Sequence, residues 1–304
     1  MGGARCRPVV LSNPRAQRQL HGSLLSALAA LLVVYGLING QALQVTRITV
    51  PIRDLPPNWH DRTIVQLTDL HLGTFNGPPF IERVAALVAA EEPDLLVITG
   101  DLFDGSSGDT TPYIEGLGSL KARHGAYMVS GNHEFITGRE GVLATVKSAG
   151  IQVIDDKVVD LDGLQLIGVA YPSRREDRRF ILDKQTGFDS GKPSVLLYHT
   201  PTDITERSGD GSLDKSNPYL RLNTQFSAAR EAGVSLQLSG HSHAGQIWPF
   251  TAMTAIIYDG LHYGLHRFDD FHVFISAGTG TWGPPLRIGS NSEIVVFTLV
   301  PASE

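Results

Sequence analysis

Five short apolar runs in this chain each end in a cluster of aspartate, histidine or asparagine residues, and this pattern restricts the possible folds most strongly. The runs cover residues 63–67, 95–98, 126–129, 195–198 and 236–238. The clusters that follow them contain, in chain order, Asp69 and His71, Asp101, Asn132 and His133, His199, and His241 and His243. The carboxyl ends of strands in layered α/β folds meet at one edge of a sheet. We therefore expect these side chains to converge on one site.

The segments between these runs have the patterns of helices and of further strands. In residues 79–92, Ile81, Val84 and Val88 recur on one face of a helix. Helices are also expected at 113–123, 139–149 and 224–232, and strands at 158–161, 164–169, 273–276 and 294–299. Alternating strands and helices predict α/β layers. The expected fold is a β-sandwich of two mixed sheets flanked by helices, with surface loops at 173–192 and 203–223.

The N-terminal region has the pattern of a membrane anchor. An uncharged apolar run over residues 24–38 follows four arginines, Arg5, Arg7, Arg15 and Arg18. The uncharged stretch extends over 22–45, long enough to span a bilayer. A buried core helix and a signal peptide cleaved after Gly40 and Ala42 are the alternatives, and we favour an uncleaved anchor.

This interpretation divides the chain into a basic tail (1–21), a transmembrane helix (22–45) and one globular domain (46–304). The arginines are expected to keep the N-terminus cytoplasmic, because positively charged flanks remain on that side. The globular domain would then be extracytoplasmic.

Composition limits the kind of site that the clusters can form. The chain has 304 residues, one cysteine and a formal net charge of −6. The single Cys6 allows no intramolecular disulfide and no thiolate zinc site, so metal ligands must be carboxylates, imidazoles or amides. The acidic balance does not indicate a nucleic-acid-binding surface. Carboxylates and imidazoles together suit Mn²⁺, Fe²⁺ or Zn²⁺, whereas carboxylates alone suit Mg²⁺ or Ca²⁺.

One Asp-x-His pair is weak evidence for a metal site, but five of the eleven histidines lie in the clusters. Two metal ions about 3.5–4 Å apart can share a bridging carboxylate and a bridging water, which they acidify to a hydroxide nucleophile. A neighbouring histidine can protonate the departing alkoxide. The clusters therefore favour metal-dependent hydrolysis of a phosphate ester or anhydride.

The order and spacing of the clusters resemble the five signature blocks of the calcineurin-like metallophosphoesterase superfamily. The blocks correspond to Asp69-x-His71, Gly100-Asp101, Gly131-Asn132-His133-Glu134, His199 and Gly240-His241-x-His243. The resemblance covers residues 62 to about 299, and its fold would be the expected two-sheet sandwich. No ligand of the family pattern is missing.

The resemblance implies a role for each clustered side chain. A first divalent metal ion would be bound by Asp69, His71 and His243, and a second by Asn132, His199 and His241. Asp101 would bridge the two ions. His133 would be the general acid and a phosphate contact rather than a ligand.

The residues around the last blocks carry a narrower resemblance. Residues 240–247 and 278–287 resemble the membrane-associated bacterial phosphodiesterases of this superfamily, some of which hydrolyse the pyrophosphate of UDP-diacylglucosamine, a lipid A precursor. This implies a phosphodiester or pyrophosphate substrate that is lipid-linked or derived from the cell envelope. A broad-specificity phosphomonoesterase and a non-catalytic metal-binding scaffold are the alternatives. Ser242 and Ala244 replace the usual Thr and Gly of the last block, and Asp104 replaces the iron-binding Tyr of purple acid phosphatases.

Three features keep more than one interpretation each. Asp104 could hydrogen-bond a metal-ligating histidine or cap its loop. Arg287 could grip a substrate phosphate or form a surface salt bridge. The apolar stretch 248–258, which contains Trp248, Phe250 and Met253, could face a lipid substrate or the bilayer, or could pack in the core.

Overall fold

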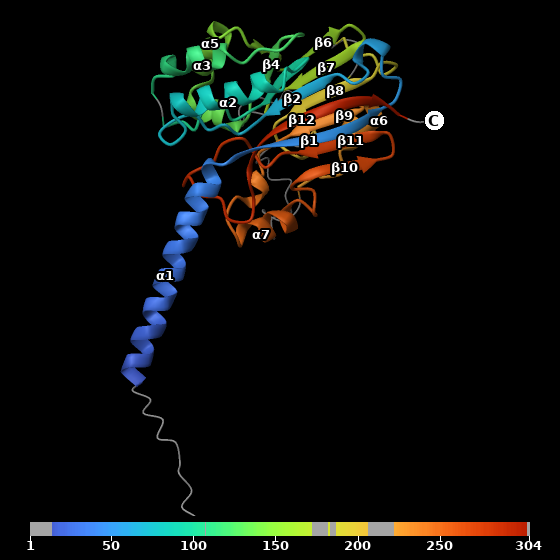
Figure 1. Cartoon of the computed structure of the whole chain (residues 1–304). Coiled ribbons are helices and arrows are strands. Elements are labelled where there is room, and N and C mark those ends of the chain that lie inside the picture. The colour runs from blue at the N-terminus through green and yellow to red at the C-terminus, as the bar shows by residue number, and fades with distance from the viewer. Residues whose placement is uncertain (1–13, 107, 172–181, 183–186, 206–221, 303–304) are drawn as a thin grey trace, which may run out of the picture.

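The computed structural model describes residues 14–106, 108–171, 182, 187–205 and 222–302. These residues form two six-stranded mixed sheets packed face to face, with helices outside them and one long helix leading away from the domain (Figure 1). The arrangement confirms the predicted α/β sandwich preceded by an N-terminal apolar helix. Arg5, Arg7 and most of the loops predicted at 173–192 and 203–223 lie outside the described residues.

The first sheet joins strands from both ends of the domain. Its order is β1 (Leu43–Ile52), β12 (Ser292–Pro301), β2 (Thr63–Leu67), β3 (Leu95–Thr99), β4 (Ala126–Val129) and β5 (Gln152–Val153). β12 runs antiparallel to β2, and all other neighbours are parallel. β1 pairs with β12 along its whole length, beginning with Leu43 opposite Ser292.

The second sheet has the order β10 (Gly264–Phe268), β11 (Phe271–Ile275), β9 (Leu236–Ser239), β8 (Ser194–Tyr198), β7 (Leu164–Val169) and β6 (Lys157–Leu161). The outer pairs β10–β11 and β6–β7 are antiparallel hairpins, and the inner four strands are parallel. The turn between β6 and β7 is Asp162-Gly163, with φ of 52° and 96°, which suits a tight hairpin.

Helices cover the outer face of each sheet. α2 (Pro78–Ala90), α3 (Ile114–Gly118) and α5 (Arg139–Ser148) pack on the first sheet, and α6 (Ser227–Ala232) packs on the second. The other described helical segments are α4 (Asn132–Thr137), α7 (Phe250–Ile257), η1 (Pro57–Trp59), η2 (Thr111–Tyr113) and η4 (His243–Gly245). The helix predicted at 113–123 is shorter, because Gly116 and Gly118 disfavour a continued helix.

Alternating side chains of the central strands fill two cores at once. In β3, Leu95 and Val97 face the second sheet, whereas Leu96 and Ile98 face the helices on the first sheet. Both faces of such a strand are buried, which explains its continuous apolar run. Each buried side chain of this size contributes about 1.5–3 kcal/mol, so the cores fix where the strands begin and end.

Strand direction defines two edges of the sandwich. β2, β3 and β4 are parallel, as are β8 and β9, and all five end at the side that we call the carboxyl edge. The two sheets share this edge, since the backbone N–H of His241, after β9, donates to Asp69, after β2. β12 is antiparallel to β2 and therefore begins here, as does β1. The hairpin turns of β6–β7 and β10–β11 lie at the opposite side, the far edge.

Helix α1 (Pro14–Gln41) joins the domain at the carboxyl edge. The segment Gln17–Gln41 is long and apolar enough to cross a membrane, and nearly all of its residues are exposed. Near its end, Gly36 O accepts a hydrogen bond from Arg287 N at 3.0 Å, and Asn39 Nδ2 donates to Ser290 O at 2.9 Å. β1 starts at Leu43, so the boundary expected between residues 45 and 46 falls within this strand.

Candidate metal centre

The polar clusters that follow the five strands meet at the carboxyl edge. Their ligand-type atoms form three groups, each within 4.8 Å: Asp69, His71 and His243; His71, Asp101 and His133; and Asp101, His199 and His241. Asn132 joins the third group through a 3.1 Å contact between its Oδ1 and His199 Nε2. All eight side chains singled out in the sequence are therefore close together.

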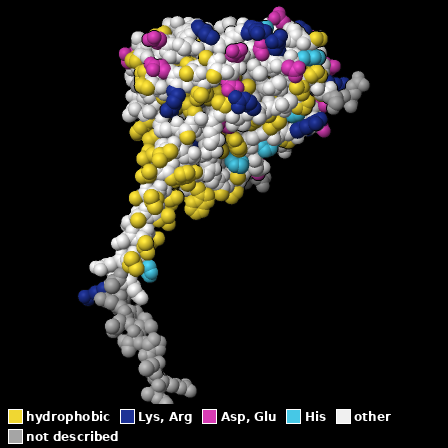
Figure 2. All heavy atoms as spheres, in the orientation of Figure 1, with side chains coloured by type: hydrophobic (Ala, Val, Ile, Leu, Met, Phe, Trp, Pro, Cys, Tyr) yellow, Lys and Arg dark blue, Asp and Glu magenta, His cyan; other side chains and the backbone are white. Residues whose placement is uncertain are grey.

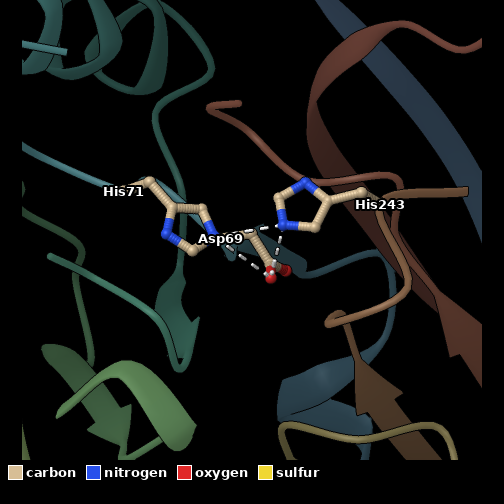
Figure 3. Close-up of side chains that lie close together, drawn as sticks. All are labelled: Asp69, His71 and His243. Atoms are coloured by element: carbon tan, nitrogen blue, oxygen red, sulfur yellow. Dashed lines mark hydrogen bonds and ion pairs between the residues drawn. The ribbon is translucent and has the colours of Figure 1, made fainter. Parts of the chain in front are cut away.

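The first group comes from the loops after β2 and β9. Figure 3 shows Asp69, His71 and His243 pointing toward one another. Asp69 Oδ1 lies 3.3 Å from His243 Nε2 and 3.9 Å from His71 Nε2, and the two Nε2 atoms are 3.1 Å apart. Two nitrogens and one oxygen thus converge on one point, as three ligands of a single ion would.

His199, directly after β8, is the centre of the second group. Its Nε2 lies 3.1 Å from Asp101 Oδ2 and 3.1 Å from His241 Nδ1, in addition to the Asn132 contact. Its Nδ1 lies 2.8 Å from Thr99 O. A carbonyl at this distance holds the ring with Nε2 facing the site, which is how protein ligands are commonly oriented.

Asp101 faces both groups. Its Oδ2 is 3.1 Å from His199 Nε2 and 3.9 Å from His71 Nε2. Its Oδ1 accepts a hydrogen bond from the backbone N–H of His133 at 2.8 Å. One carboxylate between two groups of ligands has the position that a bridging ligand requires.

The backbone at this edge adopts conformations that are uncommon for the residues present. Asp69, His71, Asp101, His241 and His243 all have positive φ, between 44° and 67°. This region favours glycine, and other residues there store strain. Neighbouring loops hold the conformation: the backbone N–H groups of Asp69 and His71 donate to Gly100 O and Asp101 O, both at 3.1 Å. Strain at five positions of the candidate site indicates a functional constraint.

Because Gly131 has no side chain, Asp101 and His199 can pack directly against its backbone. A Cβ at this position would collide with Asp101 Oδ1 and lie 2.9 Å from His199 Cγ. Any other residue would therefore displace these side chains. The Gly-Asn-His-Glu block needs its glycine for this close approach.

Burial and nearby charge set the protonation of the site. Burial lowers the pKa of His71 and His241 to about 3, lowers that of His243 well below its usual value, and raises that of Asp69 to about 6. Burial opposes a charge on His199, but the Asp101 carboxylate raises its pKa to about 10. Three histidines are therefore neutral near pH 7, the form in which imidazole binds metals.

The donor set fits a dinuclear centre of divalent ions. Nδ1 of His71 and of His243 is buried and has no hydrogen-bond partner within the described residues. A proton on each Nδ1 leaves both Nε2 lone pairs directed toward Asp69 Oδ1. Imidazoles and carboxylates in two groups joined by Asp101 make a mixed nitrogen and oxygen site, which first-row transition metals favour.

Comparison with known families identifies the class of the site. A family model described as calcineurin-like phosphoesterase matches residues 62–245, the segment that contains all eight site residues. The chain belongs to the calcineurin-like phosphoesterase family. This confirms the resemblance seen in the signature blocks, and the family is one of phosphoric ester hydrolases.

Relatives of this family member include membrane proteins. The chain is 32% identical over 283 residues to a Danio rerio "transmembrane protein with metallophosphoesterase domain", covering 90% of this chain and 62% of the relative. It is 32% identical over 245 residues to an uncharacterized metallophosphoesterase of Helicobacter pylori strain J99, covering 79% and 60%. The chain thus spans about three fifths of the length of these curated relatives. Together with α1, the transmembrane relative supports membrane association.

Among solved structures, a dimetal phosphatase from Danio rerio matches 79% of this chain and 99% of its own. The identity is 11% and the TM-score is 0.46. The assignment of this chain to the calcineurin-like phosphoesterases does not depend on this likeness, because the family model already covers the whole candidate site.

In this phosphoesterase, Glu134 organises the loops that carry the ligands, a role that the sequence pattern did not reveal. The side chain is fully buried and accepts hydrogen bonds from the backbone N–H groups of Gly131 at 2.6 Å, Leu102 at 2.8 Å and Asp101 at 3.0 Å. Burial and the Asp101 charge raise its pKa to about 7. The available signal was its place in the first turn of α4, where a glutamate can accept from free N–H groups.

Arg287 has neither of the roles considered from the sequence. Its side chain is fully buried, so it cannot form a surface salt bridge or reach a substrate phosphate. Nη2 donates to Ala277 O at 2.6 Å and to Gly280 O at 2.7 Å, and Nη1 lies 3.4 Å from His243 O. Burial lowers its pKa to about 10. Arg287 therefore holds the loop after β11 against the backbone of His243.

Asp104 caps its own loop, the second of the two roles considered for it from the sequence. Its Oδ1 accepts from the backbone N–H and the hydroxyl of Ser106, both at 2.6 Å. Its backbone carbonyl, rather than its side chain, lies 3.2 Å from Nδ1 of His133. The His133 ring is thereby held beside His71, with ring centroids 4.7 Å apart.

Tyr171 borders the second group of ligands and was not singled out in the sequence. Its ring centroid is 6.3 Å from that of His199 and 6.4 Å from that of His241. The backbone N–H of Tyr171 donates to Ser130 O at 3.0 Å, which ties it to the loop after β4. The residue follows a strand as the ligands do, but a lone tyrosine carries no metal-binding pattern.

Proposed function

We propose that this protein is a metal-dependent hydrolase that cleaves a phosphodiester or pyrophosphate bond in a lipid-linked or cell-envelope compound. The observation that carries the proposal is the convergence of Asp101 with two groups of ligand-type side chains and His133 at one edge of the sandwich. Family membership supplies the class of reaction. Helix α1, at the same edge, is the reason to place the substrate at a membrane.

The residues would divide into two ligand sets. Asp69, His71 and His243 would hold one ion, Asn132, His199 and His241 the other, and Asp101 would contact both. The mixed donors favour Mn²⁺, Fe²⁺ or Zn²⁺. When bound, two such ions lower the pKa of a water molecule and neutralise charge on the phosphoryl oxygens.

His133 is the proposed general acid. The carbonyl of Asp104 accepts from Nδ1–H, so the imidazolium form of His133 would give its Nε2 proton to the leaving oxygen and would keep the proton on Nδ1. The backbone N–H of His133 donates to Asp101 Oδ1 and fixes the residue beside the ligands. Distance alone would also allow His133 to act as a ligand with His71 and Asp101. Metal content of a His133→Ala variant separates the two roles.

The proposed orientation places the N-terminus in the cytoplasm and the domain on the other side. Arg15 and Arg18 lie in the first turns of α1, and Arg5 and Arg7 precede them. Basic residues at one end of a membrane helix remain cytoplasmic. A compartment-sensitive reporter fused to the C-terminus tests this, because activity of a cytoplasmic reporter would reverse the orientation.

The test of the reaction uses the full chain in detergent micelles with Mn²⁺. Faster turnover of a bis-aryl phosphate than of a mono-aryl phosphate supports the proposal. The opposite preference would favour a broad-specificity phosphomonoesterase. No turnover of either compound by a chain with two bound ions would overturn hydrolysis and leave a metal-binding scaffold.

A further inference from the structure

Large apolar side chains are exposed at one edge of the domain. Apart from those of α1, the described residues expose nine of them, and all nine lie in the loops and short helices after β2, β4, β9 and β11 or at the start of β10. These positions are all at the carboxyl edge. Trp248 is 68% exposed, Ile256 66% and Trp282 58%. An exposed apolar surface of this kind marks a site that contacts a membrane or another molecule.

Figure 2 shows how this surface continues into the membrane helix. Hydrophobic side chains cover the part of the domain next to α1, whereas the charged side chains in this view gather on the side away from α1. The sequence agrees, because no Asp, Glu, Lys or Arg occurs between Gly240 and Tyr258. The apolar area of α1 therefore does not stop where the helix meets the domain.

Helix α7 forms a large part of this surface. None of its eight residues is buried, and Phe250 and Met253 are 55% and 50% exposed. The predicted alternative, in which the stretch 248–258 packs in the core, holds only for Tyr258 at its end. In Figure 1, α7 lies beside the point where α1 joins the domain.

Hydrogen bonds of Gln246 and Ile288 tie the two exposed tryptophans to the segment that contacts α1. Gln246 Nε2 donates to the backbone carbonyl of Trp282 at 2.9 Å, and the backbone N–H of Trp282 donates to Gln246 Oε1 at 2.9 Å. The backbone N–H of Ile288 donates to Gln246 O at 3.0 Å, and Trp248 N donates to Ile288 O at 2.7 Å. Since the neighbouring Arg287 N donates to α1, both tryptophans have a fixed place relative to this helix.

We propose that the apolar surface formed by Trp248, Phe250, Met253, Ile256 and Trp282 lies in the interface of the lipid bilayer that α1 enters. The bilayer is the occupant that fits, because the surface is uncharged, continuous with α1 and rich in aromatic residues, which concentrate at membrane interfaces. A protein partner or a second copy of the chain would not require this continuity with α1.

The surface also has a consequence for the substrate, and this consequence rests on the proposed function. His243 lies in η4, which is separated from α7 by residues 246–249, and a Cβ at Gly245 would lie 2.5 Å from Phe250 O, so the two segments are in backbone contact. The metal centre would thus lie against the membrane surface. An amphiphilic phosphoester could place its phosphate at the ligands while its acyl chains remain in the bilayer.

The chain offers its own reporters for a test that does not depend on activity. It contains three tryptophans, of which Trp59 is fully buried between the sheets. The full chain is reconstituted into phosphatidylcholine vesicles with brominated acyl chains, which quench tryptophans that contact the lipid. Trp248→Phe and Trp282→Phe each leave one exposed reporter, and the double variant leaves Trp59 alone as the control.

The expected result is strong quenching of the wild-type emission and of both single variants, and little quenching of the double variant. Equal quenching of wild type and double variant would overturn the proposal. Unquenched exposed tryptophans, together with a dimer in cross-linking, would assign the surface to a second copy. Because no substrate is involved, failure here is distinct from failure of the proposed hydrolysis.

A charge placed on the surface gives an independent measurement. Ile256→Glu is expected to lower turnover of a vesicle-embedded phosphodiester roughly tenfold, since a charged side chain at this position opposes contact with the apolar part of the bilayer. Turnover of a water-soluble bis-aryl phosphate should not change. The matched control is Ala144→Glu on α5, an exposed position on the side away from α1. A membrane-interface role would be contradicted if Ile256→Glu and Ala144→Glu lowered turnover equally, and did so with both the embedded and the water-soluble substrate.

Discussion

The two edges of the sandwich place their charged groups in opposite environments. At the far edge, Arg53 and Asp270 form a 3.1 Å ion pair with side chains 71% and 65% exposed. At the carboxyl edge, Asp69, Asp101 and Glu134 are at most 2% exposed. Exposed pairs contribute little to stability, whereas buried carboxylates are unfavourable unless other groups compensate them. The carboxyl edge therefore carries charges that folding alone would not favour.

Backbone conformation shows the same contrast. At the far edge, positive φ occurs at Asp162 and Asp269, in hairpin turns where aspartate tolerates this region. At the carboxyl edge it occurs at His71, His241 and His243, for which it is unusual. Glu92, before β3 at the far edge, also has positive φ, so the contrast lies in the clustering of such residues around one set of facing side chains, which is typical of a functional site.

A groove at the far edge shows that volume alone does not locate such a site. It measures about 610 Å³ and is lined by residues of both charges, including Arg53, Lys192 and Asp270. Several of these charges pair with one another or with neighbours, and the described residues around the groove form no group of metal-ligating side chains. The convergence of buried imidazoles and carboxylates distinguishes the carboxyl edge instead.

Replacing the shared carboxylate should have the largest effect. Asp101→Asn removes a charge that faces both ligand groups, and turnover should fall by about 10³-fold or more, since metal ions contribute several kcal/mol to phosphoryl transfer. Bound Mn²⁺ per chain, measured by elemental analysis of the purified protein, should fall as well. A variant that keeps two ions and normal turnover would remove the main difference between the edges.

The next largest effect is expected for the proposed acid. His133→Ala should slow turnover by about 10²–10⁴-fold, the usual contribution of general acid catalysis, while metal content stays unchanged. His60→Ala, near the far edge before β2, is the matched control and should leave turnover unchanged. Loss of metal from His133→Ala would instead make this residue a ligand.

Glu134→Gln should have an intermediate effect. The amide can replace the carboxylate for some of the three backbone N–H donors but its NH₂ group cannot accept, so one buried donor loses its partner. We expect metal affinity to fall by about 10–100-fold and stability by about 1–3 kcal/mol. Isothermal titration and urea unfolding measure these changes, and the exposed Glu140→Gln should change neither. Equal behaviour of the two variants would show that Glu134 does not position the ligands.

The smallest effect is expected at the far edge itself. Arg53→Ala removes the exposed pair with Asp270, and the free energy of unfolding should change by less than about 1 kcal/mol. Any change should disappear at high salt, which screens exposed pairs. Turnover should be that of the wild type. A large loss of activity would show that the two edges are coupled, and the comparison would then fail.

The sequence predicted what local patterns can encode. The ends of β2, β3, β4, β8 and β9 follow from short apolar runs, and the ligands follow from polar residues directly after them. Glu134 was quoted in its block, but its three acceptor contacts depend on how two loops meet. Arg287 looks like a surface residue because a lone arginine is usually exposed, and its buried contacts arise from the folding of the loop at 277–290 around it.

The beginning of the domain was harder to predict for the same reason. Residues 43–45 continue the uncharged N-terminal stretch, and periodicity alone cannot separate a helix end from a strand start there. They belong to β1 because Leu43 pairs with Ser292, at the other end of the domain. Pairings between such distant segments leave no local signal.

The pairing of β1 with β12 has a consequence for the order in which the ribosome delivers the protein. α1 and β1 emerge first, but β12, the strand between β1 and β2, is synthesised roughly 240 residues later. The nascent chain would therefore be held at the bilayer while β1 still lacks its neighbour. Arg287 and its loop emerge just before β12, so insertion of this strand would complete the sheet, the contacts with α1 and the ligand loops in one late step.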